Sequence, residues 1–125
     1  MRTSMDASAA AAEARSRGAV VGVVGPAARP GDLLTQIGRE LQFPDYYGHN
    51  LDALEECLAD LSWLPDGEVV LVWDGADDLR RADPTGHAAL LEVLTAAVEE
   101  RAGTHRPLQV VLPSPPANAT RTTLP

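Results

Sequence analysis

Four carboxylates lie close together in the middle of the chain, at Asp52, Glu55, Glu56 and Asp60. Asp52, Glu56 and Asp60 are spaced by four residues, so on a helix they form one stripe, which we call the acidic stripe. Like charges at this spacing destabilise a helix by about 0.2 to 0.5 kcal/mol per pair. The stripe is therefore either a solvated acidic face or a docking surface, where carboxylates pair with the guanidinium groups of a basic protein.

The same segment offers a second chemistry. His49 is the only basic side chain near the stripe in sequence, and with Asp52 and Glu56 it has the spacing of a divalent-metal site on one helix face. A metal-dependent enzyme would need a further histidine or cysteine ligand. Cys57 follows Leu54 by three residues and is expected in the core, where burial disfavours the thiolate. The pattern favours a binding surface, with no metal or cofactor.

A loop that contains aromatic residues, at residues 43–50, precedes the stripe, and we call it the aromatic loop. Tyr46 and Tyr47 are two of only five aromatic side chains in the chain. Tyrosines beside charged groups are common at the centres of protein interfaces, although one of this pair is expected to pack onto the core. Gly48 is expected to adopt a backbone angle that other residues resist, and Asn50 to cap the helix that follows.

The overall charge indicates what kind of partner the protein binds. Ten arginines and no lysine face 18 acidic residues, for a formal net charge of -8, and 11 of the acidic residues fall between residues 40 and 79. Such a chain repels phosphate backbones and anionic lipid, which argues against nucleic acid and membrane partners and favours a basic protein.

The chain's composition favours the cytoplasm. The single cysteine, Cys57, cannot form an internal disulfide and suits a reducing compartment. No apolar run approaches the roughly 20 residues of a membrane span. Residues 1–17 lack the pattern of a signal peptide, because a short alanine run is followed by charged residues rather than by a cleavage site.

Three valine-rich stretches predict strands, at residues 19–24, 68–73 and 108–112. Each is apolar on both faces, which is typical of parallel strands covered by helices. Because parallel strands need crossover connections, the segments between them should be helical. The predicted fold is a small α/β domain, a three-stranded parallel sheet with helices packed against it.

Three helices are predicted between these strands. Asp32 is expected to cap the first, which runs to about Gln42, and Asn50 to cap the second, which carries the acidic stripe. The third begins at Asp83, where a capping acid precedes a proline, and ends near Gly103.

The two ends of the chain differ in composition from the middle. Residues 1–17 are alanine-rich and polar, and residues 113–125 contain four prolines. Both are expected to be mobile tails, because they have too little apolar surface to offset their ordering entropy. The folded domain is therefore predicted at residues 18–112.

The run from Phe43 to Leu58, FPDYYGHNLDALEECL, resembles the signature of barstar-like proteins, the intracellular inhibitors of barnase-type ribonucleases. The string YYGHNLDAL carries most of the likeness, which extends more weakly over residues 20–112. The resemblance implies a three-stranded parallel sheet with helices. It also implies a protein that is not an enzyme, a monomer that forms a 1:1 heterodimer with a basic ribonuclease.

Residue by residue, the resemblance and the acidic stripe predict a partner-binding surface. It comprises Tyr46, Tyr47, Gly48, Asn50, Leu51, Asp52, Glu55, Glu56, Asp60 and Glu100. The resemblance implies that Asp52 and Glu56 enter the cationic active site of the nuclease.

The chain departs from the family pattern at three positions. Glu55 stands where a tryptophan is characteristic, and Glu56 is one methylene longer than the usual aspartate. Ala96 replaces a contacting glutamate, with Glu100 one turn later. A barstar-fold binding module for another basic protein or toxin is therefore the alternative function.

Overall fold

The structure, a computed structural model, describes residues 6–45 and 47–113. The helices within this part of the chain are α1 (Ala7–Ser16), α2 (Pro30–Glu40), α3 (Leu51–Asp60), α4 (Ala76–Ala82) and α5 (Pro84–Arg101). The strands are β1 (Val20–Val24), β2 (Val69–Trp73) and β3 (Leu108–Val111). The fold is α/β with a three-stranded parallel sheet, as the sequence predicts.

The sheet has the order β1-β2-β3, and the first residues of the three strands lie opposite one another. Val20 lies opposite Val69, which in turn lies opposite Leu108. All five residues of β2 are buried. A central strand that is apolar on both faces requires cover on both faces, and this requirement organises the helices.

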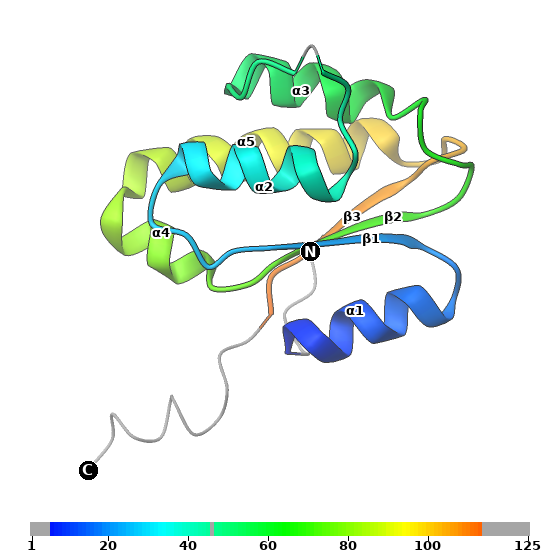
Figure 1. The fold of residues 1–125 in the computed structure, drawn as a ribbon, viewed down its shortest axis with the longest axis horizontal. Helices are drawn as coiled ribbons and strands as arrows, with labels where there is room; N and C mark the ends of the chain where they lie inside the picture. Colours follow the sequence, from blue (N-terminus) through cyan, green and yellow to red (C-terminus); the bar gives the residue numbers. More distant parts are fainter. Residues whose placement is uncertain (1–5, 46, 114–125) are drawn as a thin grey trace.

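The helices form layers on the two sides of the sheet (Figure 1). Helix α1 covers one face, while α2 and α5 lie on the other. Helix α3 contacts α5 and α2 and forms the outermost layer, away from the strands. The helix that carries the acidic stripe is therefore supported from one side and open to solvent on the other.

Two of the three predicted helix caps are confirmed. The Asn50 side chain accepts a hydrogen bond from the Ala53 backbone N–H at 2.8 Å, and Asp83 accepts one from Gly86 at 2.9 Å. The prediction for α2 is wrong, because this helix begins at Pro30 and Asp32 lies in its first turn. A proline at the first helical position has its backbone angle set for the helix and lacks an N–H that would need a cap.

The prediction of a mobile tail over residues 1–17 is wrong for α1. The Asp6 side chain caps this helix, accepting from the Ala9 N–H at 2.7 Å. Ala10 and Ala14 are buried in one apolar cluster with the sheet valines Val70, Val72 and Val111. Alanines form a face too small to stand out in the hydropathy pattern, so the docking surface on the sheet decides that this segment is helical.

Arg17 fastens the end of α1 to the sheet. Its guanidinium forms ion pairs with Glu13 on α1 and with Glu68 at the start of β2, each at 2.8 Å. It also donates a hydrogen bond to Gln109 on β3 at 3.4 Å. One side chain thus links the end of α1 to β3 and to the residue that precedes β2.

The sequence predicted one long helix between β2 and β3, whereas the structure has two, α4 and α5. Helix α4 buries only Leu79 and carries the local ion pairs Arg80–Asp77 and Arg81–Asp78. A helix of seven residues with one buried side chain has too little periodicity to be recognised in sequence.

Two backbone N–H groups, one in β1 and one just after it, donate to side chains of α2. Glu40 accepts from the Val23 N–H at 3.0 Å, and Gln36 accepts from the Gly25 N–H at 2.7 Å. These bonds satisfy an edge that would otherwise be open to pairing with another chain. They also fix α2, and with it the start of the aromatic loop.

Residues 114–125, most of the predicted C-terminal tail, lie outside the described residues. Over residues 6–45 and 47–113, no helix is long and apolar enough to cross a membrane.

Replacing Ala14 by aspartate should detach α1 from the sheet. The new carboxylate would be buried without a partner, which costs more than the roughly 1 to 3 kcal/mol of a neutral unsatisfied group. The exposed Ala12→Asp is the matched control on the same helix and should change stability by less than about 0.5 kcal/mol. Denaturant unfolding and hydrogen exchange of α1 measure the difference. Equal losses in the two variants would contradict the docking of α1 through this face.

Candidate protein-binding surface

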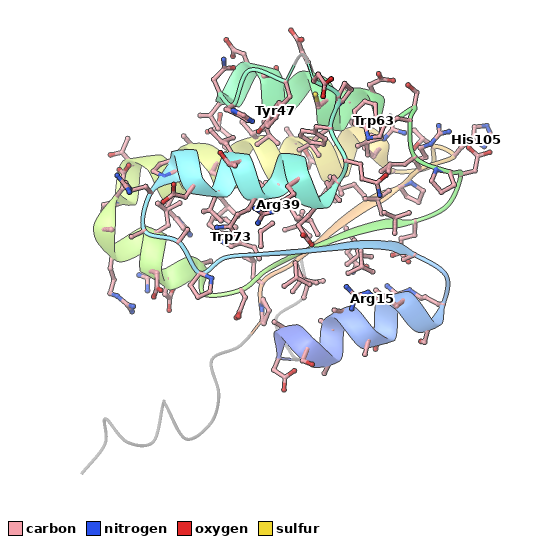
Figure 2. The ribbon with its side chains drawn as sticks, in the orientation of Figure 1. Arg15, Arg39, Tyr47, Trp63, Trp73 and His105 are labelled. Carbon is pink, nitrogen blue, oxygen red and sulfur yellow. The ribbon has the colours of Figure 1, made fainter. Side chains whose placement is uncertain are left out.

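Tyr47 anchors the aromatic loop to α2. Its side chain is 7% exposed, and its hydroxyl donates a hydrogen bond to the Leu34 carbonyl at 3.0 Å. The ring packs over Gly38, where a Cβ would lie 2.7 Å from Cε2 of Tyr47. Figure 2 shows this tyrosine between α2 and α3. One of the two tyrosines therefore packs onto the core, as expected, and Tyr47 positions the loop rather than presenting a surface.

Two aromatic side chains of the loop and one that follows α3 form a single cluster. Phe43 packs edge-to-face against Tyr47, with ring centroids 4.8 Å apart, and against Trp63, at 5.7 Å. The Trp63 indole N–H donates to the Leu41 carbonyl at 2.9 Å. Sequence reasoning missed the part played by Trp63, because it follows α3 while its ring partner precedes α3. The cluster joins the two ends of the segment that carries the acidic stripe.

The turn into α3 is made at His49. This residue has a positive φ of 54°, whereas Gly48 is not among the positive-φ residues, so the expectation for Gly48 is wrong. A Cβ on Gly48 would lie 3.3 Å from the Asn50 side-chain nitrogen, so the glycine leaves space beside the cap. The His49 ring packs edge-to-face on Tyr47 at 4.8 Å, which holds the turn ahead of Asn50.

Helix α3 has one buried and one charged face. Leu54, Cys57 and Leu58 are buried, as the leucine spacing predicts. The four carboxylates of Asp52, Glu55, Glu56 and Asp60 are exposed. Over the described residues, none of the four forms an ion pair or accepts a hydrogen bond. Their charge is therefore not neutralised within this part of the molecule.

The C-terminal end of α3 is held by a cation from another helix. Leu61 ends α3 with a positive φ of 53°, and Arg101 of α5 donates to the Ala59 carbonyl at 2.7 Å. A positive charge at a helix C-terminus stabilises the helix dipole. In sequence, His49 is the only basic residue near α3. In the structure, Arg101 supplies a positive charge at the end where Asp60 opposes the dipole.

The barstar family, described as barstar (barnase inhibitor), matches residues 27–113. The match takes in α2, the aromatic loop and the acidic stripe, and continues through β3. The chain belongs to the barstar family. Its α1 and β1 lie outside the matched residues.

In this barstar-family protein, Glu100 is the predicted contact residue that lies on α5 rather than on α3 or the loop before it. Glu100 is exposed in the last turn of α5, and the next residue, Arg101, bonds the Ala59 carbonyl of α3. Tyr46 lies outside the described residues. Ala96, which takes the place of a contacting glutamate, is half-buried. The charge of the surface is therefore concentrated on α3 itself.

The metal site suggested by His49, Asp52 and Glu56 is not formed. Among residues 6–45 and 47–113, no group of three or more histidine, cysteine, aspartate or glutamate side chains is placed to hold a metal ion. His49 packs against Tyr47 instead. Cys57 is buried, and burial raises the pKa of its thiol, with Glu56 and Asp60 adding to the shift. Neither residue is poised for metal binding or nucleophilic chemistry.

Tyr47→Phe should remove an alkaline step in stability. Burial, together with the nearby Cys57, raises the pKa of Tyr47 to about 12, above its ordinary value of 10.0. Above pH 10 the unfolded chain therefore loses this proton first, and stability falls by up to about 2 kcal/mol as the pH rises to about 12. Tyrosinate absorbance and denaturant unfolding across this range measure the effect. If both proteins lose stability equally over this range, the buried tyrosine is not its cause.

Glu56→Ala should leave the free protein as stable as before, or more stable by about 0.2 to 0.5 kcal/mol, because it relieves repulsion along the acidic stripe. Asp60→Ala should behave in the same way. Thermal and denaturant unfolding of the isolated variants measure this. A clear drop in melting temperature would mean that the carboxylate has a structural partner.

Proposed function

We propose that this protein is a stoichiometric inhibitor of a barnase-type ribonuclease, whose active site it blocks with α3 and the aromatic loop and without chemistry of its own. The observation that carries the proposal is the exposed acidic face of α3. Its four carboxylates have no ion-pair partner in the described part of the chain, and they lie within the residues that match a family described as barnase inhibitor.

The chemistry of the target explains the residue types. A ribonuclease must hold a phosphate, so its cleft presents guanidinium and ammonium groups. Carboxylates on a helix one turn apart can take the place of phosphate oxygens and accept paired hydrogen bonds from arginine. Asp52 and Glu56 are assigned this role, and Glu55 and Asp60 extend the charge.

The remaining contacts come from the segment that leads into α3. Gly48 and Asn50 are exposed and Leu51 is half-buried, so these residues would meet the rim of the nuclease cleft. Tyr46 keeps its predicted contact role. Tyr47 is buried, and its assigned role is to hold the loop.

The surface is organised before binding. Tyr47 and the Asn50 cap hold the start of α3, and Arg101 holds its end. A surface that is already ordered loses little conformational entropy on association, which favours tight binding. The proposed complex is a 1:1 heterodimer. The buried, unpaired Cys57 supports a role inside the cell, where thiols stay reduced.

A second candidate function is the neutralisation of a different basic toxin by the same surface. Glu55 favours this candidate, because a third carboxylate beside Asp52 and Glu56 suits a more cationic cleft than a tryptophan would. Assays of RNA cleavage with a panel of barnase-type ribonucleases and other basic nucleases separate the two candidates.

Asp52→Ala should weaken inhibition in assays of RNA cleavage with a panel of barnase-type ribonucleases and other basic nucleases. The loss of a hydrogen bond to a charged group costs about 1.5 to 3 kcal/mol, or roughly a 10- to 150-fold rise in Kd. Asp77→Ala on α4 is the control, with the same change in charge. An absence of inhibition by the unaltered protein at micromolar concentration overturns the first function.

Stopped-flow mixing at several salt concentrations tests the electrostatic part of the proposal. Association should exceed the roughly 10⁵ to 10⁷ M⁻¹s⁻¹ of unsteered docking and should slow steeply with salt. The electrostatic screening length falls from about 10 Å at 0.1 M salt to about 3 Å at 1 M salt. Close charge pairs across the interface therefore persist, and the dissociation rate changes less than the association rate. An association rate indifferent to salt would mean that the acidic face is only a solvated surface.

A further inference from the structure

A pocket of about 310 Å³ lies beside the aromatic loop, between this loop and α2. It is lined by Thr35, Gly38, Arg39, Phe43, Pro44, Asp45, Tyr47 and His49. The rings of Phe43 and Tyr47, which pack against each other, contribute to its walls. The pocket therefore combines a firm aromatic support with two basic side chains, in a protein whose net charge is -8.

Arg39 is unusual among the arginines of this protein. Arg17, Arg29, Arg80, Arg81 and Arg106 each form an ion pair, and Arg101 donates to backbone carbonyls. Over the described residues, only Arg39 and Arg15 have neither kind of partner. Arg39 is exposed in the last turn of α2, so its guanidinium is available to a bound molecule.

The pocket adjoins the proposed ribonuclease-binding surface. His49 and Tyr47 line the pocket, and the same residues form the turn that ends at the cap of α3. Asp52 follows in the first turn of the helix. A protein large enough to cover α3 and the loop would therefore reach the rim where Arg39 stands.

A cation at this rim has a defined consequence for a basic partner. It repels the partner unless the partner places an anionic group against it. Asp45 also lines the pocket, and its carboxylate opposes multiply charged ligands such as phosphate. A single carboxylate is anionic, as Arg39 requires, and carries only one charge, as Asp45 requires. The guanidinium of Arg39 would hold it, with the His49 ring beside it.

Resting on the proposed function, we propose that Arg39 and His49 form a specificity contact that accepts an aspartate or glutamate side chain of the nuclease at the edge of its cationic cleft. Nucleases with a basic residue at that place are rejected by Arg39. Affinity then comes from the acidic stripe, and the choice among basic partners comes from this pocket.

The sign of a charge reversal tests the proposal. Arg39→Glu should weaken binding of the inhibited ribonuclease at least tenfold, mainly through faster dissociation, whereas Arg15→Glu should leave dissociation unchanged. Figure 2 shows Arg15 on α1, on the other side of the sheet from Arg39. Each variant replaces +1 by -1 and takes the net charge from -8 to -10, so the two variants are matched in net charge. Melting temperatures confirm that both variants fold.

The opposite result overturns the proposal. If Arg39→Glu binds as tightly as Arg15→Glu, or more tightly, then no carboxylate of the partner meets Arg39. A second variant makes the test specific: replacing the contacting nuclease carboxylate by lysine should restore binding to Arg39→Glu and weaken binding to the unaltered protein. Failure of this rescue with every carboxylate at the edge of the cleft also overturns the contact.

The same measurements separate this contact from the proposed function. If Asp52→Ala weakens inhibition while Arg39→Glu does not, inhibition through α3 stands and the pocket contact is wrong. If Arg39→Glu weakens binding while Asp52→Ala has no effect, the proposed role of the acidic stripe is wrong and the pocket contact stands. If no nuclease in the panel is bound, both are overturned.

Discussion

The packing of the Tyr47 ring over Gly38 is the contact on which the binding surface depends. It is possible only because Gly38 has no side chain, and it brings the loop down onto α2 with its hydroxyl bonded to the Leu34 carbonyl. The Tyr47 ring then supports His49, whose turn leads to the Asn50 cap. Glu40 and Gln36 bond α2 to β1 and to the residue after it. The position of the start of α3 relative to the sheet is therefore fixed by a short series of contacts.

Helix α3 illustrates how a locally unfavourable segment becomes a functional one. Its carboxylates repel one another, and its last turn carries Asp60 where the dipole opposes it. The buried face of Leu54, Cys57 and Leu58 holds the helix against its neighbours, and Arg101 adds charge at its end. The cost is thus offset by contacts on the hidden side, which leaves the exposed carboxylates unpaired across the described chain.

The second face of the sheet has its own solution. The valines of β2 point to both sides, and a buried parallel sheet requires cover on each. Here α1 supplies the missing layer with alanines, whose small side chains let the helix lie close to the strands. This helix and β1 precede the residues that match the barstar family.

The sequence by itself determined the strands, the helices with leucine periodicity and the acidic stripe, because each is encoded by neighbours within one or two turns. Only the tertiary structure decided that α1 and α4 are helical, because their short apolar faces are stabilised by packing against other elements. It also placed Tyr47 in the core, moved the strained turn from Gly48 to His49, and brought Arg101 to the end of α3. These outcomes depend on residues distant in sequence, which local patterns do not relate.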